Sequence, residues 1–245
     1  MEKVVYRLTK EEGVSGESFR DMLIHELSPA IDNLVEGIMI YVIDEAVALT
    51  STDRLGEEAA SALPGAPGAD GMISIWLRSV SITNQIEPII ENFTKSFDGY
   101  LVTESEPLPN VRLDVASIRR TTGFDQVCFL QKPVTQDYSD WLYNWQGLHT
   151  QVAIDTQSTC RYTQNLVVRS LTEGALDLHG IVEEGWPDQT AMYDPFVFYN
   201  AIGDEEKMHR NSQLMMESCS RFIDFEGEPC DLIGMSQYIV KNRVN

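Results

Sequence analysis

The second half of the chain carries a histidine whose spacing from two tryptophans suggests acid–base chemistry. Trp141, Trp145, Leu148 and Val152 recur at three- and four-residue intervals, which predicts one apolar stripe along a helix. His149 lies on or beside this stripe. An imidazole next to aromatic walls can act as an acid or base near neutral pH. We therefore predict His149 as a catalytic residue with Trp145 beside the substrate; a buried structural histidine is the alternative.

A second histidine and a carboxylate occur together in the segment LHGIVEE, residues 178–184. Alternation along a strand places His179, Ile181 and Glu183 on one face. If that face borders a cavity, Glu183 would orient or charge-stabilise an imidazole, and Gly180 on the other face would let a ligand or a neighbouring backbone approach. We predict His179 and Glu183 as catalytic partners, against the alternative that their face is solvated.

The segment CRYTQNLVVRSL, residues 160–171, has the pattern of a buried strand but contains several polar side chains. Alternation places Tyr162 and Gln164 on one face and Asn165 on the other. Polar groups buried without partners cost about 1–3 kcal/mol each, so they require either an internal network or a ligand. We predict that Tyr162, Gln164 and Asn165 present hydrogen-bonding groups to a substrate; a network between sheet and helix is the alternative.

Aromatic side chains cluster after the second of these strands. Trp186 ends the segment EEGW, and YDPFVFY follows it. Aromatic walls with a few convergent polar groups are typical of a pocket for a flat, oxygenated ligand. We predict Trp186 as a substrate-binding residue, with simple core packing as the alternative.

The elements that would position these residues occur twice. Each half of the chain shows a strand, a helix, two strands, a second helix and a last strand. This β-α-β-β-α-β order is that of a ferredoxin-like unit, an antiparallel sheet with helices on one face. We predict an N-terminal unit over residues 1–110 and a C-terminal unit over 111–245.

Two such units can bury their open sheet faces against each other as a dimeric α+β barrel. The fold class is therefore predicted as α+β, and uncovered sheet edges would favour a homodimer. Residues 51–71, rich in Ala, Gly, Pro and acidic side chains, interrupt the first unit. They are read either as a disordered insertion or as a lid over a site.

Composition excludes several classes of function. The 245 residues carry 18 Lys and Arg against 38 Asp and Glu, a net charge of −20, which disfavours nucleic acid and anionic membranes as partners. No apolar run approaches the roughly 20 residues of a membrane span, and the first residues lack a secretory signal pattern, so a cytoplasmic location is expected. The spacing of the four cysteines suggests reduced thiols, and no metal site is predicted.

Four segments of the second half together resemble the EthD domain, a family of the dimeric α+β barrel superfamily. They are KPVTQDYSDWLYNWQGLHTQVAID, YTQNLV, DLHGIVEEGW and EKMHRNSQLMMESCSRFID, within residues 124–241. The first half resembles the family only in its order of elements. The resemblance implies an enzyme, often dimeric, that acts on aromatic or polyketide-like substrates without a metal or organic cofactor.

From these residues and this resemblance we predict a cofactor-independent lyase, a decarboxylase of a hydroxylated aromatic or β-keto acid in aromatic compound catabolism. Such substrates carry their own electron sink, so the protein need supply only acid–base groups and a positioned pocket. His149 would move the proton, His179 with Glu183 would be the partner acid or charge stabiliser, and Tyr162 with Asn165 would hold substrate oxygens. The alternatives are a cofactor-free oxygenase, dehydratase or cyclase, and a non-catalytic small-molecule-binding barrel.

Overall fold

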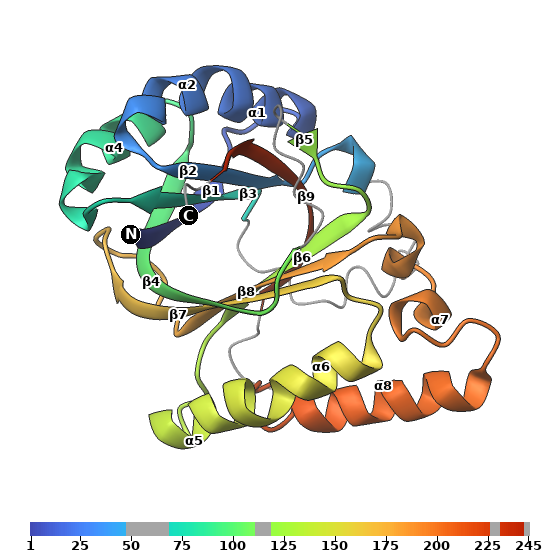
Figure 1. Cartoon of the computed structure of the whole chain (residues 1–245). Coiled ribbons are helices and arrows are strands. Elements are labelled where there is room, and N and C mark those ends of the chain that lie inside the picture. The colour runs from blue at the N-terminus through green and yellow to red at the C-terminus, as the bar shows by residue number, and fades with distance from the viewer. Residues whose placement is uncertain (48–68, 111–118, 226–230, 243–245) are drawn as a thin grey trace.

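Strands form a barrel at the centre of the molecule, and helices pack on two opposite sides of it (Figure 1). The structure is a computed structural model that describes residues 1–47, 69–110, 119–225 and 231–242. The first unit consists of β1 (Glu2–Thr9), α1 (Gly16–Met22), η1 (Leu23–Leu27), α2 (Ser28–Ile31), η2 (Asp32–Leu34), β2 (Gly37–Val42), β3 (Gly71–Leu77), η3 (Val80–Ile82), α4 (Thr83–Ile90) and β4 (Ser96–Leu108).

The second unit repeats this order with longer helices. It consists of β5 (Arg119–Arg120), β6 (Phe124–Leu130), α5 (Tyr138–Leu142), η4 (Tyr143–His149), α6 (Thr150–Thr156), β7 (Arg161–Ser170), β8 (Gly180–Trp186), η5 (Gln189–Met192), α7 (Pro195–Phe198), α8 (Glu205–Cys219) and β9 (Asp231–Lys241). The segments η1 and η4 are π-helical, and η2, η3 and η5 are 3-10 turns.

Pairing between the units closes the barrel within one chain. Strand order is β2-β3-β1-β4 in the first unit and β7-β8-β6-β9 in the second, the ferredoxin-like order in both. The unit edges pair as β4 with β7 and β2 with β9, all antiparallel. The α+β barrel predicted from the sequence is confirmed. Because the units close on each other, barrel closure does not require a second chain, and the homodimer stays a prediction.

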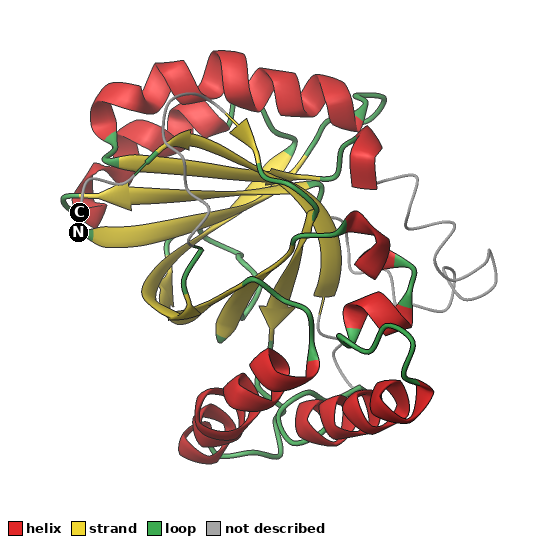
Figure 2. Cartoon of the chain, turned by 45° about the vertical axis from the view of Figure 1, so that its right-hand side comes forward, coloured by secondary structure: helices red, strands yellow, loops and turns green. Residues whose placement is uncertain are grey.

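Alternation along the strands explains why the molecule has three apolar layers, one inside the barrel and one between each unit's sheet and its helices. In β1, Val4, Tyr6 and Leu8 pack against the helices of the first unit, whereas Val5 points into the barrel. Both faces of the strand are therefore buried: Lys3 to Leu8 are all buried, as expected for a strand between two layers. The third layer lies between the second unit's sheet and helices, and Figure 2 shows the two helical layers on either side of the strands.

Two of the predicted features fall on residues outside the described part of the chain. The unit boundary at 110/111 adjoins residues 111–118, and most of the predicted insertion lies within residues 48–68. The unit boundary and the role of the insertion therefore stay predictions. Among the described residues, no helix has both the length and the apolarity needed to cross a membrane.

Candidate functional site

A cavity of about 170 Å³ lies between the sheet of the second unit and its helices. Its walls are mostly apolar and aromatic, which suits a flat organic ligand. The polar and aromatic side chains that line it include Trp145, His149, Gln157, Tyr162, Glu184 and Tyr199. Three residues predicted from the sequence, Trp145, His149 and Tyr162, thus meet in one place.

The helix α8 closes the cavity and is held in place by polar contacts to neighbouring segments. Asp204 caps its N-terminus by accepting from the backbone N–H of Lys207, which satisfies one of the unpaired donors of the first turn. On the buried face, Asn211 Nδ2 donates to the backbone oxygens of Thr156 (3.2 Å) and Tyr199 (2.9 Å). These bonds fix α8 against α6 and α7, so the cavity wall is built from rigid elements.

His149 lies at the end of the π-helical segment η4 and is 5% exposed. Its Nδ1 is 3.1 Å from Ser218 Oγ on α8, and its ring centroid is 4.7 Å from that of Phe222. Burial lowers the pKa of His149 to about 4, because desolvation disfavours the charged imidazolium. At neutral pH the ring is therefore a neutral base. Its place at the end of η4 also fits a functional role, because π-helical segments are common at functional sites.

Glu184 is the carboxyl group of the cavity and was missed by the sequence analysis. It is 5% exposed on β8. Burial raises the pKa of Glu184 to about 8, although the positive charge of Arg161 partly offsets this effect. The Gln157 amide is oriented to satisfy the hydrogen bonding of both its oxygen and its nitrogen. In this orientation its Nε2 donates to Glu184 Oε1 (3.2 Å). At neutral pH the group is therefore mostly a protonated acid, in the same cavity as the neutral base His149.

Tyr162 and Trp145 complete the wall on the sheet side. Tyr162 is directly opposite Glu184 in the pairing of β7 with β8. Burial raises the pKa of Tyr162 well above its ordinary value, so its hydroxyl stays a hydrogen-bond donor. The Trp145 ring lies on Gly180, where an added Cβ would be 2.6 Å from the ring. Gly180 thus admits an aromatic side chain to the sheet.

Glu183 and Asn165 face the other way, into the barrel. Glu183 Oε1 accepts from Lys3 Nζ (2.8 Å) and from Asn165 Nδ2 (3.0 Å), and Oε2 accepts from Tyr41 Oη (2.5 Å) and Arg161 (3.1 Å). Burial alone would raise the pKa of Glu183, but the charges of Lys3 and Arg161 outweigh it and lower the pKa to about 2. Asn165 thus joins a polar network inside the barrel, not the predicted network between sheet and helix, and its substrate-binding role stays a prediction.

His179 does not share a face with Glu183, so that part of the strand analysis was wrong. Its ring meets that of Trp141 edge-on at 5.8 Å, and its Nδ1 accepts from the backbone N–H of Lys132 (3.3 Å). The reason is that β8 begins only at Gly180, so regular alternation does not extend back to residue 179.

Gln164 and Trp186 also make contacts outside the cavity. Gln164 Nε2 donates to Thr150 Oγ1 (2.8 Å), which joins the sheet to α6. Trp186 stacks between Phe124 and Phe198, with ring centroids 5.0 and 5.1 Å away. The substrate-binding roles predicted for these two residues stay predictions.

In the described part of the chain, no three or more His, Cys, Asp and Glu side chains are grouped so that they could hold a metal ion. Cys128, Cys160 and Cys219 form no disulfide bond, and Cys230 lies outside the described residues. Glu184, His149 and Tyr162 are titratable groups of the cavity lining, set within a mostly apolar wall.

Comparisons with known proteins identify the fold. No family model matches the chain, and no curated protein matches it. An anthrone oxidase-like protein is similar in structure, with 10% identity, a TM-score of 0.51 and coverage of 98% of this chain and 91% of that chain. A monooxygenase from Fusobacterium nucleatum subsp. nucleatum has 6% identity, a TM-score of 0.46 and coverage of 98% and 92%.

A mutant chlorite dismutase from Candidatus Nitrospira defluvii is similar at 12% identity, with a TM-score of 0.44 and coverage of 96% and 90%. At such identities the likeness concerns the fold alone, and membership in the EthD family stays a prediction. The chain has the dimeric α+β barrel fold, with both units supplied by one polypeptide.

Proposed function

We propose that this protein is an acid–base enzyme that acts on a flat, oxygenated aromatic or polyketide-like molecule in the cavity of the second unit. One observation carries the proposal: Glu184 and His149 line the same apolar cavity, and their environments move their pKa values apart, to about 8 and about 4. A pair tuned in this way holds an acid and a base ready at neutral pH.

The chemistry that fits this pair is removal of a proton from a phenol or from a C–H bond next to a carbonyl. His149 would accept the proton. The electron pair left behind would delocalise onto the substrate oxygen, which would accept hydrogen bonds from protonated Glu184 and from Tyr162. Donors placed where negative charge develops are commonly the largest contribution to catalysis of this kind.

The composition of the cavity bears on the type of reaction. Decarboxylation requires a carboxylate substrate, and the described lining contains neither Lys nor Arg to pair with it. The apolar wall would promote loss of carbon dioxide by desolvating the carboxylate, but it would also weaken binding of the anion. A decarboxylase therefore remains a candidate, and a neutral substrate fits the cavity better.

Cofactor-free oxygenation is the corresponding reaction of a neutral substrate. The deprotonated carbon would add to dioxygen, and loss of water from the resulting hydroperoxide would convert a CH₂ group to a carbonyl, consuming one O₂ and releasing one H₂O. The name of the anthrone oxidase-like protein that shares this fold supports testing anthrones, which have such a CH₂ group between two rings.

The test is mass spectrometry of anthrones, hydroxyaryl acids and β-keto acids incubated with the protein, with and without oxygen. Oxygen-dependent gain of mass supports oxygenation, and loss of 44 Da without oxygen supports decarboxylation, carbon dioxide being the expelled group. A panel bound tightly but returned unchanged would contradict an enzymatic role and favour the non-catalytic binding barrel.

Variants then assign the residues. Glu184→Gln and His149→Gln are each expected to lower kcat about 10²–10⁴-fold. His25→Gln is the matched control, because His25 occupies the π-helical segment of the first unit but is exposed. The wild type should show a bell-shaped kcat/KM with limbs near pH 4 and pH 8, and Glu184→Gln should lose the alkaline limb. Near-normal turnover in both variants would contradict the assignment.

A further inference from the structure

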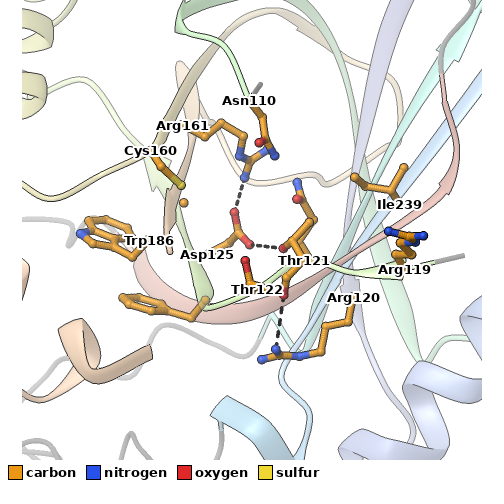
Figure 3. A pocket seen from close by; sticks show the side chains of 13 residues that line it. Asn110, Arg119, Arg120, Thr121, Thr122, Asp125, Cys160, Arg161, Trp186 and Ile239 are labelled. Carbon is orange, nitrogen blue, oxygen red and sulfur yellow. Dashed lines mark hydrogen bonds and ion pairs between the residues drawn. The ribbon is translucent and has the colours of Figure 1, made fainter. Parts of the chain in front are cut away.

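A second pocket, of about 230 Å³, lies on the barrel side of the sheet and has a different chemistry (Figure 3). It is lined by the ends of strands of the second unit and by the segment around β5. Three of the 18 Lys and Arg of the chain line it, Arg119, Arg120 and Arg161, against one of the 38 Asp and Glu, Asp125. In a chain with a net charge of −20, this lining carries the opposite sign.

Arg161 is fixed in place and still has a donor to offer. It is 4% exposed and forms ion pairs with Asp125 (2.5 Å) and Glu183 (3.1 Å) through its terminal nitrogens. Its Nε is buried without a hydrogen-bond partner among the described residues. A buried N–H without a partner is costly, so this group would favour an acceptor entering the pocket.

Gly185 creates the space beside that donor. A Cβ at this position would lie 3.0 Å from Asp125 Oδ1 and 3.5 Å from Arg161 Nε. Gly185 itself lines the pocket. A side chain at this position would crowd Asp125 and Arg161, so glycine keeps the approach to the Arg161 Nε open, and an acceptor must reach that group from the side away from Asp125 Oδ1.

Arg120 supplies positive charge from the other side. Its Nε donates to Ser236 Oγ (3.1 Å), and its terminal nitrogens donate to the backbone oxygens of Thr121 (3.3 Å) and Gly123 (3.1 Å). These acceptors are neutral, so they hold the guanidinium in position without cancelling its charge. Figure 3 shows Asp125 and Thr121 between Arg120 and Arg161.

We infer that the pocket at this end of the barrel binds a small oxyanion, the carboxylate or phosphate group of a small molecule, between Arg161 and Arg120 above Gly185. Guanidinium groups match the geometry of both kinds of oxyanion. The site is separate from the cavity of Glu184 and His149, since it lies on the opposite face of β7 and β8, and it stands whether or not the acid–base proposal holds.

Calorimetric titration of the whole protein with inorganic phosphate and with oxalate, each against chloride at constant ionic strength, tests this inference. We expect saturable binding of at least one of the two. Tighter phosphate binding would identify a phosphorylated ligand, and tighter oxalate binding a carboxylic acid. Absence of saturable binding of either probe would overturn the inference.

Variants locate the binding. Arg120→Gln and Gly185→Ala should each weaken it about tenfold or more, the first by removing charge and the second by filling the space. Arg78→Gln removes an exposed arginine that pairs with Glu36 and should bind as the wild type does. Glu184→Gln should also bind normally. If Arg120→Gln, with its fold verified by circular dichroism, kept full affinity, or if Arg78→Gln lost as much, the site would not be this pocket.

Discussion

The adjacent residues Glu183 and Glu184 on β8 have pKa values shifted in opposite directions. Glu183 points into the barrel, where Lys3 and Arg161 lower its pKa to about 2, and Glu184 points into the helix-side cavity, where burial raises its pKa to about 8. Both are almost completely buried. The difference shows that burial alone does not decide the charge of a carboxyl group: the partners that the fold places around it do.

The two faces of β8 therefore have different roles, one in joining the two units and one at the candidate site. The barrel face holds a compensated network that joins the two units, since Lys3 and Tyr41 belong to the first unit and Glu183 to the second. The cavity face holds an uncompensated acid. Uncompensated, buried titratable groups lower stability and therefore mark candidate functional sites.

The largest expected effect is a difference in the free energy of unfolding between a variant on the barrel face and a variant on the cavity face. Glu183→Gln would remove the counter-charge that Lys3 and Arg161 share and leave each with one carboxylate partner, Glu104 and Asp125, so it should lower the free energy of unfolding by about 3 kcal/mol or more. Glu184→Gln replaces a neutral buried acid by a neutral amide and should change it by less than about 1 kcal/mol at pH 5. Urea unfolding of both variants measures this, and equal losses would contradict the contrast.

The next effect is the pH dependence of that stability. The ordinary pKa of a glutamate is 4.5, and the pKa of Glu184 in the native protein is about 8. Between these two pH values, the native carboxyl group keeps a proton that the unfolded chain has lost. The free energy of unfolding of the wild type should therefore fall through this window. Glu184→Gln lacks this titration, so its advantage over the wild type should grow from pH 5 to pH 8 by a few kcal/mol and then level off. A difference independent of pH would show that the pKa of Glu184 is not raised.

Titration of His149 runs in the opposite direction. Its native pKa of about 4 lies below its ordinary 6.5, so the native state binds fewer protons in this window and stability falls as the pH is lowered from 6.5 to 4. Because both proteins in the previous comparison contain His149, its contribution cancels, and the difference isolates Glu184.

The fold was predictable because its signals are local. Strand and helix periodicities in each half predicted two ferredoxin-like units. The pairing of β4 with β7 and of β2 with β9 joins segments far apart in sequence, and no local pattern specifies it. Closure of the barrel within one chain therefore became visible only in the structure.

The site was partly predictable for the same reason. Helical spacing placed Trp145 and His149 on one stripe, and the structure has both at the cavity with Tyr162. Glu184 was missed because alternation shows that consecutive glutamates face opposite ways but not which face borders the cavity. The register of Tyr162 opposite Glu184 supplies that information, and a single sequence does not contain it.

A smaller effect tests the shape of the cavity. In Gly180→Ala the new Cβ would approach the Trp145 ring at 2.6 Å, so the ring should shift, at a cost of about 1–3 kcal/mol, and turnover should fall. Gly99→Ala is the control, because its Cβ would meet the Tyr6 ring at 2.8 Å on the outer face of the first unit. Thermal unfolding should detect both variants, but activity should change only in Gly180→Ala. Equal loss of activity in both would mean that the cavity is not the site.

The smallest effect joins the two pockets through Arg161. Its positive charge lowers the pKa of Glu184 across the sheet, and an oxyanion bound beside it would offset part of that charge. If both proposals hold, saturating phosphate or oxalate should raise the alkaline limb of the pH–rate profile by a fraction of a pH unit. Arg120→Gln, which should bind the anion weakly, should show no such shift at the same concentration. A limb that stays in place in the wild type, with binding verified by calorimetry, would mean that the sheet insulates the catalytic acid from the barrel, and that the two faces of β8 act independently.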